Sequence, residues 1–107
     1  MQLMTQDIAE KLPPLYHFED THTPAIASVK YFDPTGSWTW YVAEGQKQDD
    51  GDWLFWGLVQ GFECEYGYFT LRQLERAKDG CTGLAALPIE RDLHFTPTPL
   101  KELSARR

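Results

Sequence analysis

The spacing of hydrophobic residues at the start of the chain predicts one short helix. Ile8 and Leu12 lie four positions apart, so they share a helix face, and Thr5 stands where a capping residue is expected. Pro13-Pro14 should end this helix, because proline lacks a backbone N–H and restricts the residue before it. The polar stretch 17–24 then predicts a connecting loop.

A spacing of two residues follows and predicts a β-hairpin. Apolar and polar residues alternate over 25–32 and again over 37–44, so that Trp40 and Tyr41 face opposite sides of the second strand. Between them lies the turn Asp33-Pro34-Thr35-Gly36. Proline suits the second turn position, and we expect the terminal glycine to adopt a positive φ.

The rest of the chain continues the same alternation of strands and turns. A capping-box pattern, Thr70-Leu71-Arg72-Gln73, predicts the start of a second helix. The remaining predicted elements are a polar loop over 45–52, a central strand over 53–59, a strand over 62–69, a helix over 70–78 stopped by Asp79-Gly80, an extended segment over 89–95 and a helix that begins at 98–99 with proline in its first position.

This order of elements predicts the fold class. Consecutive antiparallel strands with helices at the ends are typical of α+β proteins. We therefore expect a single α+β domain over residues 1–107, with a mainly antiparallel sheet of four or five strands that is covered on one face. Short helices should lie at the N-terminus, after the fourth strand and at the C-terminus.

Composition and charge exclude several classes of protein. No apolar run approaches the ~18–20 residues of a membrane span, and the N-terminus lacks the pattern of a secretory signal, so we expect a cytoplasmic protein without membrane contact. The net charge of −6 disfavours direct nucleic-acid binding. That charge is uneven, because residues 1–67 hold 3 basic against 11 acidic side chains. No phosphate-binding glycine motif occurs, and no cofactor is predicted.

Aromatic residues are concentrated in the acidic part of the chain. Twelve of the 15 lie between Tyr31 and Phe69. A sheet covered on one face would leave some of them exposed, with Phe32, Tyr41 and Trp56 as candidates, and exposed Trp and Tyr side chains favour protein interfaces. The predicted binding residues are Trp40, Tyr41, Glu44, Asp49, Asp50, Asp52, Trp56, Glu63 and Glu65.

The densest group of ionisable residues lies near the C-terminus. On a strand, Glu90, Asp92 and His94 would share one face, with neighbouring Cβ atoms ~6.5–7 Å apart, where they could serve acid–base catalysis or hold a divalent metal. The alternative is a polar outer face, with Arg91 turned inward and paired with a glutamate of the strand 62–69. Because no nucleophile accompanies the group, no residue is assigned as catalytic.

Two further groups have chemistry that their spacing supports only weakly. His17, Glu19 and His22 could contribute to a metal site, but loop sites need ligands from a second element, so no metal is assigned. Cys64 is expected in the core and Cys81 nearer the surface, and neither has the neighbouring base that an active thiol needs.

Several short sequence blocks give the chain a resemblance to a known family. These are Leu12-Pro13-Pro14-Leu15-Tyr16, Val29-Lys30-Tyr31-Phe32, Ser37-Trp38-Thr39-Trp40-Tyr41 with Glu44, Gly57-Leu58-Val59 with Gly61, Glu63 and Glu65, Gly67-Tyr68-Phe69, and Ile89-Glu90-Arg91-Asp92-Leu93. The chain resembles a bacterial family of small proteins of unknown function, carried on plasmids, phages and integrative elements. Trp56 departs from that family's pattern. The resemblance implies a shared fold and a genomic setting, and it supplies no functional residues.

These observations favour binding over catalysis. We expect an accessory protein of a mobile genetic element that binds a host or element-encoded protein, one with a basic nucleic-acid-binding cleft that its carboxylates would occupy as nucleic-acid mimics. Two alternatives stay open. One is a small hydrolase-like or metal-dependent enzyme that uses Glu90, Asp92 and His94, and the other is a module that binds single-stranded nucleic acid through its aromatic residues.

Overall fold

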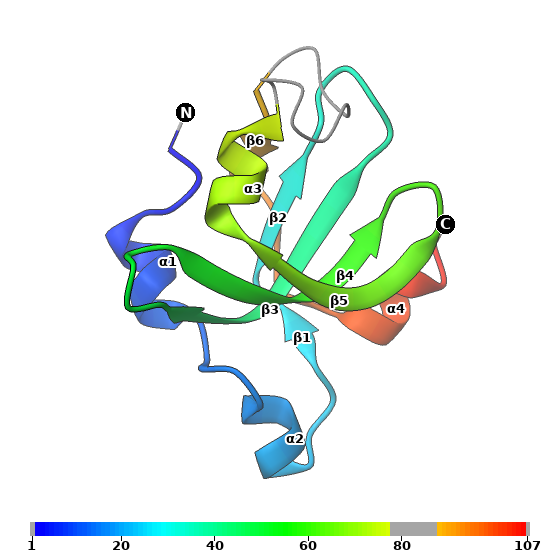
Figure 1. Cartoon of the computed structure of the whole chain (residues 1–107). Coiled ribbons are helices and arrows are strands. Elements are labelled where there is room, and N and C mark those ends of the chain that lie inside the picture. The colour runs from blue at the N-terminus through cyan, green and yellow to red at the C-terminus, as the bar shows by residue number, and fades with distance from the viewer. Residues whose placement is uncertain (1, 78–87, 107) are drawn as a thin grey trace.

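The computed structural model describes residues 2–77 and 88–106, which form two antiparallel sheets and four short helices (Figure 1). The larger sheet has the strand order β5-β4-β3-β2-β6, and the smaller pairs β1 with β7. The strands are β1 Ile26–Ala27, β2 Val29–Phe32, β3 Thr39–Lys47, β4 Trp53–Gln60, β5 Cys64–Thr70, β6 Glu90–Arg91 and β7 Thr98–Pro99. The helices are α1 Gln6–Lys11, α2 His17–Thr21, α3 Leu71–Glu75 and α4 Leu100–Ser104. The α+β prediction is confirmed.

Local signals in the sequence determine where several elements begin. Thr5 caps α1, since its side chain accepts a hydrogen bond from the backbone N–H of Ile8 at 3.3 Å. Thr70 and Gln73 form the predicted capping box of α3, with reciprocal bonds of 2.8 and 3.2 Å. The last helix begins at Leu100, so Pro99 is the residue that precedes it and not, as predicted, its first residue.

The predicted hairpin of β2 and β3 is present, but Gly36 has a different role from the one expected. Gly51, with φ 88°, is the one glycine with a positive φ among residues 2–77 and 88–106. Gly36 is needed for space instead, because a Cβ there would lie 2.5 Å from Oδ2 of the buried Asp33. The other carboxylate oxygen of Asp33 accepts bonds from the N–H and hydroxyl of Thr35 and so organises the turn.

Two segments predicted as loops contain regular structure. The stretch 17–24 begins with the five-residue helix α2, which projects beyond the sheet in Figure 1. The stretch 45–52 begins with the last three residues of β3, which pair with Trp53–Phe55 of β4. α2 is held by a partner distant in sequence, because Glu44 accepts the backbone N–H groups of Tyr16 and Phe18. Residues 45–47 instead extend a hairpin, because the facing residues of β4 satisfy their backbone groups despite their polar side chains.

The predicted extended segment 89–95 is mostly irregular. β6 spans only Glu90 and Arg91, at the edge of the sheet beside β2. The carboxylate of Asp92 then accepts a 2.9 Å bond from the backbone N–H of His94, which turns the chain away from the sheet. β6 and β5 are opposite edges of the sheet, so the predicted pairing of Arg91 with a glutamate of β5 is wrong. The Arg91 Nε–H instead donates to the carbonyl of Gln2 at 3.2 Å.

Hydrophobic residues pack on both faces of the sheet, which corrects the prediction of a sheet covered on one face. One cluster lies beneath α1 and α3 and contains Leu3, Ile8, Leu12, Val29, Tyr31, Trp40, Val42, Phe55, Phe69, Leu74, Ala77 and Ile89. The second lies beneath α4 and contains Ala27, Tyr41, Ala43, Leu58, Leu100 and Leu103. Trp40 and Tyr41 are therefore buried on opposite faces, and the prediction that Tyr41 is exposed is wrong.

Some predictions fall on residues 78–87, outside the described part of the chain. They are the end of the second predicted helix at Lys78, its stop at Asp79-Gly80 and the exposed thiol of Cys81. Within the described ranges, no helix is long and apolar enough to cross a membrane.

Candidate functional site

A β-bulge in β3 turns Glu44 away from the face that alternation predicts for it. Val42 pairs with Gly57, but the next paired residue is Glu44, opposite Trp56, so Ala43 is an extra residue in the strand. Val42 packs in the cluster under α1, whereas Ala43 lies in the cluster under α4. Without the bulge, Glu44 would point into the first cluster. With it, the carboxylate points to the second face, beside Trp56.

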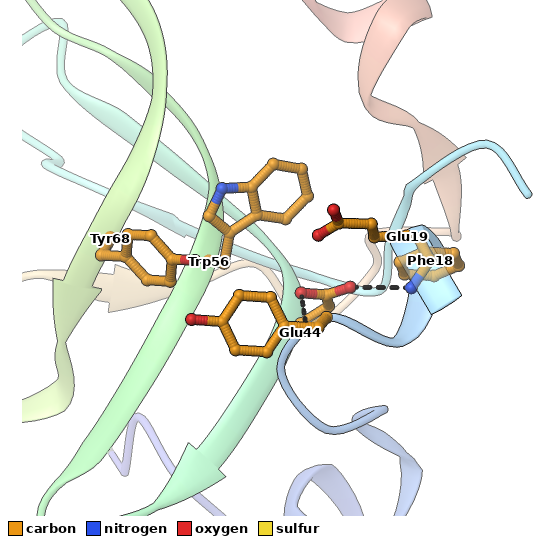
Figure 2. Close-up of a pocket in the computed structure, with 6 residues that line it drawn as sticks. Phe18, Glu19, Glu44, Trp56 and Tyr68 are labelled. Atoms are coloured by element: carbon orange, nitrogen blue, oxygen red, sulfur yellow. Dashed lines mark hydrogen bonds between the residues drawn. The ribbon is translucent and has the colours of Figure 1, made fainter. Parts of the chain in front are cut away.

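Glu44 is buried, with 4% of its surface exposed, and both carboxylate oxygens accept backbone hydrogen bonds. The N–H of Tyr16 donates to Oε1 and the N–H of Phe18 donates to Oε2, each at 2.9 Å (Figure 2). Tyr16 has a left-handed backbone, with φ 70°, which costs about 1–2 kcal/mol in a residue with a Cβ. Two charge-assisted bonds offset that cost and hold the start of α2 against β3.

The proline pair after α1 brings residues 16–18 to Glu44. The carbonyl of Pro13 accepts a 3.0 Å bond from the N–H of Gly45, so the chain after α1 crosses the end of β3. The two segments lie close together at this crossing, because a Cβ on Gly45 would lie only 3.0 Å from side-chain atoms of both Leu12 and Phe55. Glycine avoids these close contacts. The local sequence thus places two backbone donors beside a carboxylate that is 26–28 residues away in the chain.

These contacts create a pocket of about 150 Å³ between α2 and the sheet. Its lining residues are Tyr16, Phe18, Glu19, Glu44, Trp56 and Tyr68. Figure 2 shows the carboxylates of Glu19 and Glu44 pointing into the same space, with Trp56 on one side and Phe18 on the other. The pocket therefore combines aromatic walls with two acidic groups.

The pocket has a negative field that no lysine or arginine side chain neutralises within the described ranges. The ion pairs found there are Lys30–Asp92, Arg72–Asp50 and Arg106–Glu102, and none involves the two pocket glutamates. At the pocket rim, a hydrogen bond with the Tyr16 side chain raises the pKa of Tyr68, and burial and the charges of Glu44 and Glu19 raise it further. All of these effects stabilise the neutral phenol.

Beside the pocket lies a continuous group of aromatic residues that we call the tyrosine surface: Tyr16, Trp56, Tyr66 and Tyr68. The three tyrosines are 55%, 53% and 52% exposed. Trp56 stacks on Tyr66, with ring centroids 6.1 Å apart and an interplanar angle of 13°. Trp56 also faces Tyr68 across β4 and β5, and the Tyr16 side chain lies close enough to Tyr68 to raise its pKa. Large aromatic rings that remain half exposed in the folded protein are available to contact a partner.

The predicted acidic binding residues do not form one surface. Asp50 pairs with Arg72 at 3.3 Å, and one oxygen of Asp52 accepts the backbone N–H groups of Trp53 and Arg72. These aspartates, with the exposed Asp49, form the turn before β4. Glu63 and Glu65 are exposed near the other end of β4, where Glu65 pairs with Val59, so most of the eight-residue length of β4, about 25 Å, separates them from this turn. Of the predicted binding residues, the pocket brings together Glu44 and Trp56.

The predicted catalytic group is only partly assembled. Asp92 and His94 line one shallow pocket of about 350 Å³, whereas Glu90 sits opposite Phe32 in the sheet. Asp92 is engaged by Lys30 at 3.8 Å and by the N–H of His94. No Ser, Thr or Cys side chain lines this pocket within the described residues.

The predicted metal candidates are distributed along α2. His17 makes an edge contact with the ring of Phe18, Glu19 lines the pocket described above, and His22 ends the helix with φ 54°. Across residues 2–77 and 88–106, no three His, Cys, Asp or Glu side chains are placed to hold a metal ion. Cys64 is a half-buried free thiol that packs against the cluster under α4.

Comparison with known proteins identifies a family. The family described as protein of unknown function (DUF2958) matches residues 3–105. The chain belongs to this family. The DUF2958 match includes all the helices and strands given above, so the pocket and the tyrosine surface lie within the family's domain. No curated protein and no solved structure matches the chain.

Sequence reasoning identified part of this site and missed the rest. Glu44, Trp56 and Glu19 were candidates, but Phe18 and Tyr68 were not. One signal was available in the sequence, because strict alternation places Glu44 on the same face as Trp40 and Val42, in the core. A carboxylate at a core position of a strand indicates either a buried partner or a bulge.

Proposed function

We propose that this protein acts by binding another protein, and that the tyrosine surface is where the partner docks. The observation that carries the proposal is the exposure of three tyrosines in one continuous group around Trp56. Tyrosine and tryptophan are the residues that most often dominate binding energy at interfaces. Their rings bring a large contact area while few rotatable bonds are immobilised.

The charges at this surface favour a partner with basic side chains. Glu19 and Glu44 lie beside the tyrosines without a lysine or arginine partner among the described residues. Phosphate groups would be repelled there, so base stacking on the tyrosines is a weaker explanation than protein binding. Opposite charges also accelerate association and make it sensitive to salt.

The setting of the proposal is the bacterial cytoplasm, with the protein as an accessory factor of a mobile genetic element. A host or element-encoded protein that handles nucleic acid would supply the basic groups. Mimicry of a phosphate chain would need a row of free carboxylates, but Asp50 and Asp52 are engaged by Arg72 and the Glu63–Glu65 group lies about 25 Å away. We therefore favour recognition of individual basic side chains over mimicry of a nucleic-acid strand.

Affinity purification with a matched pair of variants tests this proposal. Tagged wild-type protein, the double variant Tyr66→Ser/Tyr68→Ser and the control Leu93→Ser are expressed in the native host, and captured proteins are quantified by mass spectrometry. Leu93 suits the control because it is 61% exposed and follows β6, at the opposite edge of the sheet from β5.

We expect a basic protein to be captured by the wild type and by Leu93→Ser but to be lost from the tyrosine variant. Its capture should weaken as salt rises. Circular dichroism must show that the variants remain folded. Equal capture by all three proteins would contradict the proposal, and capture of nucleic acid alone would favour the stacking alternative.

A further inference from the structure

The size of the pocket limits what it can hold. Its volume is about 150 Å³, about half the lower limit of typical pockets for drug-sized ligands, which hold ~300–1,000 Å³. A nucleotide or a common cofactor would not fit inside it. The head group of one amino-acid side chain would fit. This limit points to a pocket that accepts a single residue from a partner.

The charge of the pocket specifies the sign of that head group. Glu44 is buried, with 4% of its surface exposed. Its ionised carboxylate can accept hydrogen bonds but cannot donate one. Its two backbone bonds leave further lone pairs available, and the exposed Glu19 adds a second carboxylate that points into the same space. Two close carboxylates repel each other unless a cation lies between them. The pocket is therefore suited to a positive charge.

The walls of the pocket specify that this cation is organic. Phe18, Trp56, Tyr16 and Tyr68 contribute aromatic rings, and the faces of such rings attract ammonium and guanidinium groups. A strongly hydrated metal ion would gain little from these walls, and it would find only two carboxylates. A lysine or arginine can bury its aliphatic stem against the rings while its head meets the acids.

We propose that the pocket formed by Glu19, Glu44 and the surrounding aromatic rings binds the cationic side chain of a lysine or arginine from the partner protein. This inference rests on the proposed function, since it assigns the central contact of the same interface. It goes further than a role for Glu44 in holding α2, because an anchoring role alone predicts no affinity for a cation.

Nuclear magnetic resonance titration of the isotope-labelled full chain measures this binding directly. The compounds are N-acetyl-arginine methylamide and N-acetyl-lysine methylamide, with N-acetyl-glutamine methylamide as the neutral control and sodium chloride as the ionic-strength control. The Trp56 indole N–H and the Phe18 backbone N–H report on the pocket. Glu19→Gln removes one pocket charge, and Glu65→Gln removes an equally exposed acid from β5.

We expect either cationic compound to shift both signals to saturation, and the tighter one identifies the side chain. Glu19→Gln should weaken binding about three- to tenfold, while Glu65→Gln leaves it unchanged. A shift that does not saturate, a shift by the glutamine compound of the same size, or equal effects of the two variants would overturn the proposal.

Two combined outcomes separate this inference from the proposed function. If the cations fail to bind but partner capture still depends on Tyr66 and Tyr68, the pocket proposal fails and the docking surface stands. If the cations bind but capture is independent of those tyrosines, the docking surface fails and the pocket stands.

Discussion

The hydrogen bonds of Glu44 allow a sharp test of how α2 is held. In Glu44→Gln the side chain keeps its shape, but its amide nitrogen carries two hydrogens and cannot accept a bond. One of the two backbone donors, Tyr16 N–H or Phe18 N–H, would then face another donor in place of a carboxylate oxygen 2.9 Å away. The substitution therefore leaves one N–H unpaired and replaces the other charge-assisted bond with a bond to a neutral carbonyl oxygen.

Two opposing effects determine how much Glu44→Gln changes the free energy of unfolding. Loss of a hydrogen bond to a charged group costs about 1.5–3 kcal/mol. Removal of the charge would relieve a burial penalty, since Glu44 is 4% exposed. We expect the hydrogen bond to dominate, because the carboxylate lines a pocket with room for water, which reduces the penalty of its burial. For a domain of this length, a loss of 1.5–3 kcal/mol lowers the Tm by about 7–13 °C.

Urea unfolding and native-state hydrogen exchange measure the global and local effects. The midpoint should fall with an unchanged m-value, and the amide hydrogens of Tyr16 and Phe18 should exchange faster. Glu65→Gln, at an exposed site, should stay within about 0.5 kcal/mol of the wild type. An unchanged or raised stability of Glu44→Gln would refute the reasoning, since burial of the charge would then outweigh its hydrogen bonds.

Two further substitutions test other parts of the fold. Thr70→Ala removes the capping side chain of α3 and should lower the free energy of unfolding by about 1 kcal/mol in urea, whereas an unchanged midpoint would mean that the cap is dispensable. Burial raises the pKa of Tyr31 far above its ordinary value of 10.0, so its neutral form stabilises the fold below pH 10 and that stabilisation is lost as pH rises. Tyr31→Phe, which removes the 2.5 Å bond to the carbonyl of Leu3, should be less stable at neutral pH but lose less Tm between about pH 9 and 11. If the wild type and Tyr31→Phe lost the same Tm over this pH range, the assignment of that loss to Tyr31 would be wrong.

Local patterns predicted the elements whose signals lie within a few residues. The cap at Thr5, the capping box at Thr70 and the hairpin of β2 and β3 each depend on neighbours in the chain, and each is present. The errors fall where hydrogen-bond partners, and not the polarity of the segment itself, decide the backbone conformation. α2 depends on Glu44, and the end of β3 depends on β4.

The candidate site was predictable only in part, for a similar reason. The abundance of aromatic and acidic residues in one part of the chain predicted that some aromatic side chains would be exposed and that Glu44 would contribute to binding. The choice among those aromatics depended on coverage of the second sheet face by Leu100 and Leu103 of α4, which bury Tyr41 and leave the tyrosines of β5 outside. Alternation assigns residues to a face, but it does not show what covers that face.

The sequence by itself determined the α+β class, the order of the main strands and the concentration of acidic and aromatic residues, because periodicity, turns and caps are local properties. The tertiary structure alone decided which of those residues meet. A single extra residue at Ala43 rotates Glu44 to the face where α2 and β5 supply Phe18, Glu19 and Tyr68. A bulge is a register shift between two strands, so its effect on a side chain exists only once the strands have paired.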